Sequence, residues 1–120
     1  MNNKRIQKLN SLLRKVISEV IQKDIRNPNI SHLTSVTSVD ITKDLKYAKV
    51  LISIIGSDNE KATTIKALNK AAGFISTQAS KKIVIRYFPA LTFELDTSVD
   101  KQMKIEKILL EIEKEKKSRQ

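Results

Sequence analysis

Positively charged side chains without nearby acids are the residues best suited to ligand chemistry in this sequence. No aspartate or glutamate occurs between Glu60 and Glu94, a segment that holds Lys61, Lys66, Lys70, Lys81, Lys82 and Arg86. The first eighteen residues are also free of acids and hold Lys4, Arg5, Lys8, Arg14 and Lys15. Ammonium and guanidinium groups bind phosphate oxygens strongly. The two segments therefore predict a surface that meets phosphate, against the plainer alternative of lysines that merely face water.

Composition narrows the classes of partner. The chain has 120 residues, enough for one domain with a modest core. Its net charge of +10 favours nucleic acid first and an anionic membrane surface second. Without cysteine there is no disulfide, thiolate metal site or thiol nucleophile. No apolar run approaches the ~20 residues of a membrane span. The amino-terminal segment is amphipathic, unlike an export signal, so we expect a cytoplasmic protein.

Candidates for catalysis or metal binding are weak. His32 is the only histidine, and it has no cysteine, serine or aspartate partner nearby in a catalytic pattern. Glu94, Asp96 and Asp100 fit a metal cluster only loosely, because the first two belong on the polar face of a strand. No glycine-rich nucleotide loop is present. We therefore expect a protein that is not an enzyme and that uses no metal or cofactor.

Two helices that meet at a bend must position the central charges. Apolar residues recur with a helical spacing at Ile65, Leu68, Ala72, Ile75 and Ala79. Ser57 and Glu60 have the spacing of a capping box and start the first helix. Gly73 interrupts the pattern, where glycine weakens a helix by about 1 kcal/mol relative to alanine. We expect a bend there that needs backbone freedom or close approach.

The remaining segments alternate between helix and strand. Residues 4–23 have a helical apolar pattern, and residues 46–55 have the clearest strand pattern. Residues 32–42 also read as a strand, with Leu33, Val39 and Ile41 on one face and Val36 on the other. A third strand covers residues 91–95, whereas residues 83–87 are open to either strand or loop. A last helix carries Met103, Ile105, Ile108, Leu109 and Ile112 as its apolar stripe.

This order predicts an α+β fold with two layers. Two strands joined by a short loop pair antiparallel, and the third strand returns after a helical crossover. Helices then cover one face of the sheet. We place the folded domain at residues 1–113 and a basic, flexible tail at residues 114–120, which buries nothing.

Several short motifs resemble one known family. They are Ala71-Ala72-Gly73 at the bend, Val36-Thr37 with Val39, Asp44-Leu45 before Ala48-Lys49-Val50, and Arg86 with Pro89, Leu91, Phe93 and Asp96. Their order and spacing, from about Arg5 to Leu110, resemble the ribosome-binding factor A family. The resemblance implies a type II KH-like fold, in which Ala-x-Gly replaces the usual Gly-x-x-Gly loop. It also implies binding to the small ribosomal subunit and its RNA during late maturation, often with a role in the cold.

This resemblance and the charge pattern together suggest one RNA-binding surface. Gly73 would let the backbone approach a phosphate at the start of the second helix, with Lys70, Lys81 and Lys82 around it. The basic face of the first helix would extend the surface. The expected contacts are Arg5, Lys8, Arg14, Lys15, Lys66, Lys70, Ala71, Gly73, Lys81, Lys82 and Arg86, presented by a monomer. A general RNA- or DNA-binding protein and a protein-docking module are the alternatives.

Overall fold

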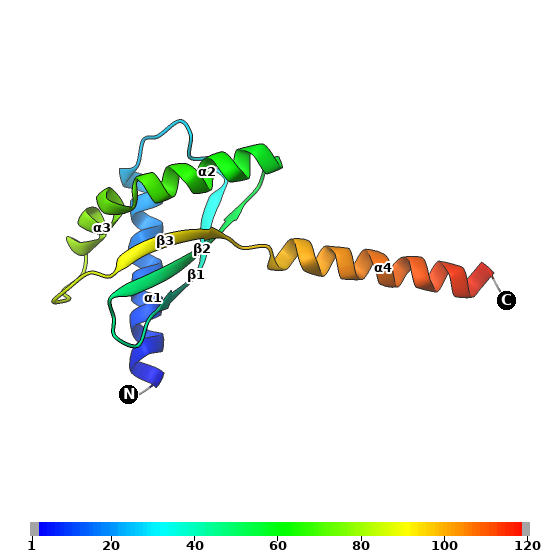
Figure 1. Cartoon of the computed structure of the whole chain (residues 1–120), viewed down its shortest axis with the longest axis horizontal. Coiled ribbons are helices and arrows are strands. Elements are labelled where there is room, and N and C mark those ends of the chain that lie inside the picture. Colours follow the sequence, from blue (N-terminus) through cyan, green and yellow to red (C-terminus); the bar gives the residue numbers. More distant parts are fainter. Residues whose placement is uncertain (1–2, 119–120) are drawn as a thin grey trace.

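The computed structural model describes the backbone of residues 3–118. Figure 1 shows a compact body and one helix that leaves it. In chain order the elements are α1 (Asn3–Glu19), the π-helical turn η1 (Val20–Asp24), β1 (Thr34–Ile41), β2 (Tyr47–Ile54), α2 (Asp58–Lys70), α3 (Ala72–Ser80), β3 (Ala90–Leu95) and α4 (Ser98–Ser118). The predicted order of helices and strands is confirmed, and residues 83–87 form a loop.

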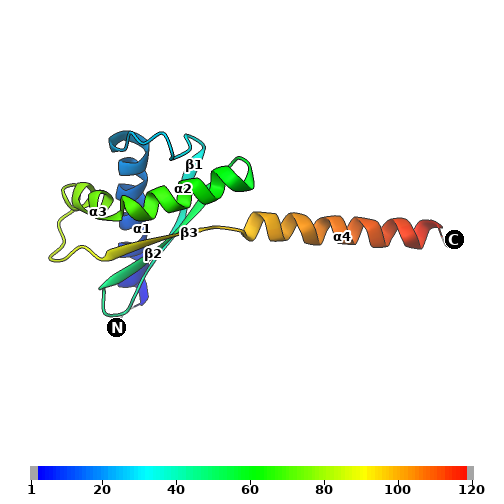
Figure 2. The ribbon, with the colours of Figure 1, turned by 45° about the horizontal axis from the view of Figure 1, so that its top comes forward.

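The three strands form one sheet in the order β1-β2-β3. β1 and β2 pair antiparallel, and β3 returns parallel to β2 after the α2–α3 crossover. Burial alternates along β2 and β3, and along β1 on either side of one irregularity, so one face of the sheet is buried and the other is open. α1 packs over β1, whereas α2 and α3 pack over β3 (Figures 1 and 2). The result is the predicted two-layer α+β sandwich.

A bulge in β1 changes which residues of that strand face the core. The pairing with β2 shifts between Val36 and Ser38, so one extra residue lies in β1 at Thr37. Val36 and Val39 are therefore both buried, although they are three positions apart. Leu33 precedes the strand and is exposed. The predicted placement of Val36 on the face opposite to Leu33, Val39 and Ile41 is wrong, because strict alternation does not allow for a bulge.

The core is built from small aliphatic side chains and one aromatic ring. Leu13 and Ile17 of α1, Val50 and Ile52 of β2, and Phe93 of β3 are almost fully buried. Burying each such side chain contributes roughly 1.5–3 kcal/mol relative to its exposure. The helices that carry the candidate phosphate contacts are therefore held rigidly against the sheet.

α4 is the exception to this packing. It points away from the body in both views (Figures 1 and 2). The described apolar residues of its stripe are exposed, for instance Leu109 at 55%. The helix also continues to Ser118 and does not end near Glu113, the point at which we expected a flexible tail to begin. No helix of the described part, residues 3–118, is both long and apolar enough to cross a membrane.

Candidate nucleic-acid interface

α2 begins as the sequence predicts. The Ser57 hydroxyl accepts a hydrogen bond from the Glu60 N–H at 3.2 Å and donates one to the Glu60 carboxylate at 3.3 Å. The Lys61 N–H donates to the Ser57 carbonyl at 3.0 Å. The first of these bonds satisfies an amide that the first turn of a helix leaves free, and the bond from Lys61 is the first of the helical ladder. The predicted N-cap at Ser57, with Glu60 as its partner, therefore sets where α2 starts.

The bend between α2 and α3 lies at Ala71, two residues before the glycine. Ala71 has φ −90° and ψ 5°, outside the helical region, and its N–H is shared between the carbonyls of Ala67 and Leu68. Gly73 lies inside α3 without a positive φ. A Cβ at Gly73 would meet no atom within 4 Å beyond its own helix backbone. The expectation that the bend needs glycine for dihedral freedom or close approach within the chain is therefore wrong.

What fixes the bend is an anchor at the end of α2. The Asn69 side chain donates to the Phe93 carbonyl at 3.0 Å and accepts from the Phe93 N–H at 2.8 Å. Phe93 lies in the middle of β3, and its ring is buried beneath the helices. α3 then continues toward α1 and η1. Since Gly73 is exposed on the outer side of this arrangement, its bare backbone faces solvent.

The central lysines are exposed, but they do not form one cluster. Lys66 and Lys70 lie on the outer side of α2, and Lys81 follows the end of α3. Within the described residues none of these three is in an ion pair. The nine residues of α3 span about 13 Å between the bend and Lys81. Lys70 and Lys81 therefore lie at opposite ends of α3, so the predicted ring of lysines around a single phosphate is not present.

Lys82 has a partner within the chain. Its Nζ lies 3.7 Å from the carboxylate of Asp24 in η1, and both side chains are about one-third exposed. The fold thus places Asp24, which lies outside the acid-free segment 61–93, beside a lysine of that segment. Lys82 ties the end of α3 to η1 and is less available to a phosphate than Lys81.

The cations of α1 lie on two sides of that helix. Each residue turns an α-helix by about 100°, so Leu12 and Arg14 lie on opposite flanks of the buried Leu13. Arg5 and Lys8 lie on the Leu12 flank, which faces the α3–β3 loop. Arg14 instead donates from Nε to the Val36 carbonyl of β1 at 3.4 Å. Lys15 is exposed near the back of the helix.

The structure therefore brings Arg5 and Lys8, but not Arg14, toward the loop that carries Arg86. Between α1 and this loop is a largely apolar hollow of about 590 Å³. Arg86 is exposed, and its guanidinium lies 5.4 Å from the centre of the Tyr87 ring. The hollow is lined by Arg5, Ile6, Lys8, Leu9, Leu12, Leu45, Val84 and Ile85.

On α2 and α3 acids occur only in the first turn of α2, at Asp58 and Glu60, and the other acids of the described chain lie elsewhere, such as on the open sheet face. On the open face of the sheet Glu94 lies 3.6 Å from Lys49, and Asp40 is exposed. Hydrogen bonds from the Ser98 hydroxyl and N–H lower the pKa of Asp96, which keeps a negative charge where α4 begins. Among the described residues no group of His, Asp or Glu is arranged to hold a metal ion. The side chain of Asp100 lies outside the described residues.

Sequence reasoning missed a second concave surface, which lies between η1 and the start of β1. Its lining includes Lys23, Arg26 and His32. His32 reads as an ordinary solvent-facing residue in the sequence, because the wall formed by Ile21, Gln22 and Lys23 comes from η1, earlier in the chain. Lys23 and Arg26, which precede Asn27-Pro28, and His32, which follows it, are the signal that the sequence offers.

Comparison with known proteins places the chain in a family. A family model described as ribosome-binding factor A matches residues 5–109. Ribosome-binding factor A of Protochlamydia amoebophila is 60% identical over 116 residues, which cover 97% of this chain and 88% of the relative.

A crystal structure and a fitted model of one relative share the fold. The crystal structure of ribosome-binding factor A from Thermus thermophilus has a TM-score of 0.67 at 21% identity, covering 75% of this chain and 93% of its own. A homology model of the Thermus thermophilus protein, fitted into the cryo-EM map of a 30S complex, has a TM-score of 0.62 at 21% identity over the same shares. The predicted type II KH-like sandwich is thereby confirmed. The chain belongs to the ribosome-binding factor A family.

Proposed function

We propose that this protein binds the small ribosomal subunit and its RNA during late maturation, as a cytoplasmic monomer. The structure fitted into the map of a 30S complex supports the choice of partner, because it has the same fold. The surface we assign to RNA is the helical layer, made of α2, α3, the α3–β3 loop and the Leu12 flank of α1. Cold adaptation is part of the same proposal.

One observation carries the choice of surface. Charge differs between the two faces of the sandwich. On α2 the acids are confined to the first turn, at Asp58 and Glu60, and exposed lysines follow, whereas the open sheet face carries the Lys49–Glu94 pair. Lys66, Lys70 and Lys81 present ammonium groups outward along more than the length of α3. A row of cations at this spacing suits successive phosphates of an RNA backbone. The exposed backbone at Gly73 would allow one phosphate to approach α3 closely.

A chain with few aromatic residues favours recognition of phosphate and shape on this layer. Aromatic residues make up 4% of the sequence; Phe93 is buried in the core, and on the helical layer Phe74 and Tyr87 are the exposed rings among the described residues. Stacking platforms for a series of bases are therefore scarce. Binding to the layer should consequently depend strongly on salt and weakly on base sequence.

The test compares two triple variants with the same change in net charge. Lys66→Gln/Lys70→Gln/Lys81→Gln removes the outward lysines of the helical layer. Lys49→Gln/Lys107→Gln/Lys114→Gln removes three exposed lysines from the open sheet face and α4. Affinity for purified small subunits is measured over a range of salt concentrations for both variants and the wild type.

We expect the first variant to lower the log–log salt slope by about 2–3, since it removes three phosphate contacts that contribute roughly 0.7–0.9 each. Melting temperatures should change little, because all six side chains are exposed. Equal losses of affinity in both variants would show that net charge drives binding, and the assigned surface would be wrong. A wild type that binds duplex DNA as tightly as subunits would favour the general nucleic-acid-binding alternative.

A further inference from the structure

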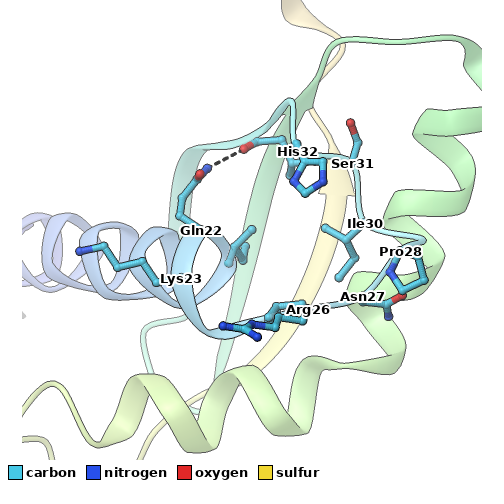
Figure 3. Close-up of a pocket in the computed structure, with 11 residues that line it drawn as sticks. Gln22, Lys23, Arg26, Asn27, Pro28, Ile30, Ser31 and His32 are labelled. Carbon is cyan, nitrogen blue, oxygen red and sulfur yellow. Dashed lines mark hydrogen bonds between the residues drawn. The ribbon is translucent and has the colours of Figure 1, made fainter.

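The concave surface between η1 and β1 is lined by none of the three lysines of the row, Lys66, Lys70 and Lys81. The chain from Ile21 to Thr34 curves around a hollow of about 500 Å³. Figure 3 shows Gln22 on one side and the His32 ring with Ile30 on the other, while Lys23 extends outward from the rim. A volume of this size is within the range of small-ligand pockets, about 300–1,000 Å³.

The wall of the pocket that η1 forms has an unusual backbone. η1 is a π-helical turn, closed by a hydrogen bond from the Ile25 N–H to the Val20 carbonyl at 3.1 Å. Such turns are rare and occur often at functional sites. The side chain of Gln22 leaves this turn and donates to the Thr34 carbonyl at 2.9 Å. That bond joins the two sides of the pocket and holds the amide in place.

The opposite wall is held by its own bonds. The Ser31 N–H donates to the Thr64 hydroxyl at 3.3 Å, which donates in turn to the Asn29 carbonyl at 3.4 Å. The Ile30 N–H donates to the Asn27 carbonyl at 3.0 Å, and the Ile30 side chain is buried. A loop fixed in this way presents its side chains with little ordering cost on binding.

The lining combines three kinds of group. Ile21, Ile25 and Ile30 supply aliphatic surface, and His32 supplies a flat ring. Arg26 and Lys23 supply positive charge, and no acid lines the pocket. Asp24, which stands between these cations in sequence, is paired with Lys82.

One buried polar group beside the pocket has no partner. Thr34 is 3% exposed, and among the described residues its hydroxyl makes no hydrogen bond. An unpaired buried hydroxyl destabilises a fold, so most such groups have an explanation in a ligand, a water or a function. Thr34 is also one of the residues that line the hollow.

We propose that this pocket binds one unpaired nucleotide, with its base against Ile30 and His32 and its phosphate at Arg26. A bare phosphate would not use the aliphatic walls, and a purely apolar ligand would not use Arg26 or the fixed amide of Gln22. A metal ion would need carboxylates that the lining lacks. A planar heterocycle with polar edges and a charged phosphate uses all three kinds of group.

The nucleotide belongs to a single-stranded part of an RNA, a source that rests on the proposed function. The Lys82–Asp24 pair joins the end of α3 to η1, so the pocket adjoins the row of lysines on the helical layer. The row would hold the backbone, and the pocket would take one base out of its stack. A free mononucleotide has the same chemistry and is the alternative source.

The first arm of the experiment measures small-subunit binding by the full chain. His32→Ala should weaken binding about tenfold, since base stacking on a side chain contributes on that scale. His32→Phe, which keeps a flat ring, should bind nearly as the wild type does. Arg26→Gln should lower the salt slope by roughly 0.7–0.9, whereas Lys49→Gln on the open sheet face should leave it unchanged. All three positions are exposed, so folding is preserved.

The second arm titrates the protein with adenosine or uridine 5′-monophosphate and, separately, with inorganic phosphate, following backbone amide resonances. The nucleotides should shift the amides of Gln22, Ile30 and Thr34, and phosphate alone should not. Equal shifts with inorganic phosphate would overturn the base-binding pocket.

The two arms separate the possible failures. Mononucleotide binding together with full subunit affinity for His32→Ala would identify free nucleotide as the ligand and overturn the RNA source. Lysine variants that weaken subunit binding while His32→Ala and Arg26→Gln do not would overturn the pocket and leave the proposed function standing. A wild type that does not bind subunits would overturn the proposed function and the RNA source together.

Discussion

α1 and α4 have similar sequence patterns and opposite fates. Both carry apolar residues at helical spacing, and both form the predicted helix. In α1 the stripe is buried, with Leu13 and Ile17 at 0% exposure, whereas in α4 Ile108 and Leu109 are both 55% exposed. The apolar period therefore reports that a helix forms and which face is apolar. Whether that face meets the rest of the chain depends on where the preceding element leaves the helix.

Charge shows the same contrast. The described cations of α1 stand on a helix without an acid before Glu19, whereas acids are interleaved with Lys107 and Lys114 along α4. A single-sign surface attracts a polyanion, and a mixed one largely cancels at a distance of about one Debye length, ~8–10 Å. α1 thus adds to the field of the helical layer, and α4 adds little.

The strongest test of the contrast between α1 and α4 replaces one isoleucine by alanine in each helix, in two separate variants. Ile17→Ala should lower the free energy of unfolding by about 2–5 kcal/mol, since it leaves a cavity in a close-packed core. Ile108→Ala should change it by less than about 0.5 kcal/mol, because the side chain is already exposed. Urea denaturation at equilibrium measures both. Comparable losses would mean that the α4 stripe is covered in solution.

Replacing one polar residue in the folded body and one in α4 tests the same contrast for hydrogen bonds. Asn69→Ala removes both bonds to the Phe93 backbone and should destabilise the protein by about 1–3 kcal/mol, because a buried amide and carbonyl lose their partner. Glu106→Ala on α4 is the matched control and should be nearly neutral. If Asn69→Ala unfolds at the same urea concentration as the wild type, the anchor does not set the bend.

Gly73 in α3 is like the residues of α4 in one respect, because a methyl group placed there would contact no part of the chain beyond its own helix backbone. Gly73→Ala should raise the free energy of unfolding by up to about 1 kcal/mol, since alanine is the better helix former and the added methyl has open space. The same change should weaken subunit binding if a phosphate approaches the backbone there. Thermal melts and subunit titration measure the two effects. Loss of stability would show that the bend does require glycine.

Truncation should give the smallest effect on folding. Deletion after Glu113 removes the tail proposed as flexible, and deletion after Thr97 removes all of α4. Both shortened proteins should keep a cooperative melt within a few degrees of the full chain, because the described side chains of α4 bury little. A broad transition after the longer deletion would place α4 within the folded domain, as the predicted boundary at residue 113 does.

Much of the fold could be read from local patterns. Alternation over Tyr47–Ile54, the Ser57–Glu60 capping box and the period of α1 each depend on residues that are close in sequence. Two antiparallel strands followed by a helical crossover leave few arrangements for the third strand. The acid-free segments were equally visible, because charge is a property of composition.

The tertiary structure decided features that depend on distant partners. The bulge at Thr37 puts Val36 on the buried face of the sheet. The hydrogen bonds from Asn69 to Phe93 place the bend at Ala71. The ion pair with Asp24 makes Lys82 less available to a phosphate than Lys81. The tertiary structure also turned Arg14 toward β1 and left α4 without a surface to cover. The sequence by itself determined which segments are helical, extended and charged, because those tendencies act over a few residues. Only the folded chain determined which charges face outward together, because each hydrogen bond and ion pair that redirects a side chain joins residues far apart in sequence.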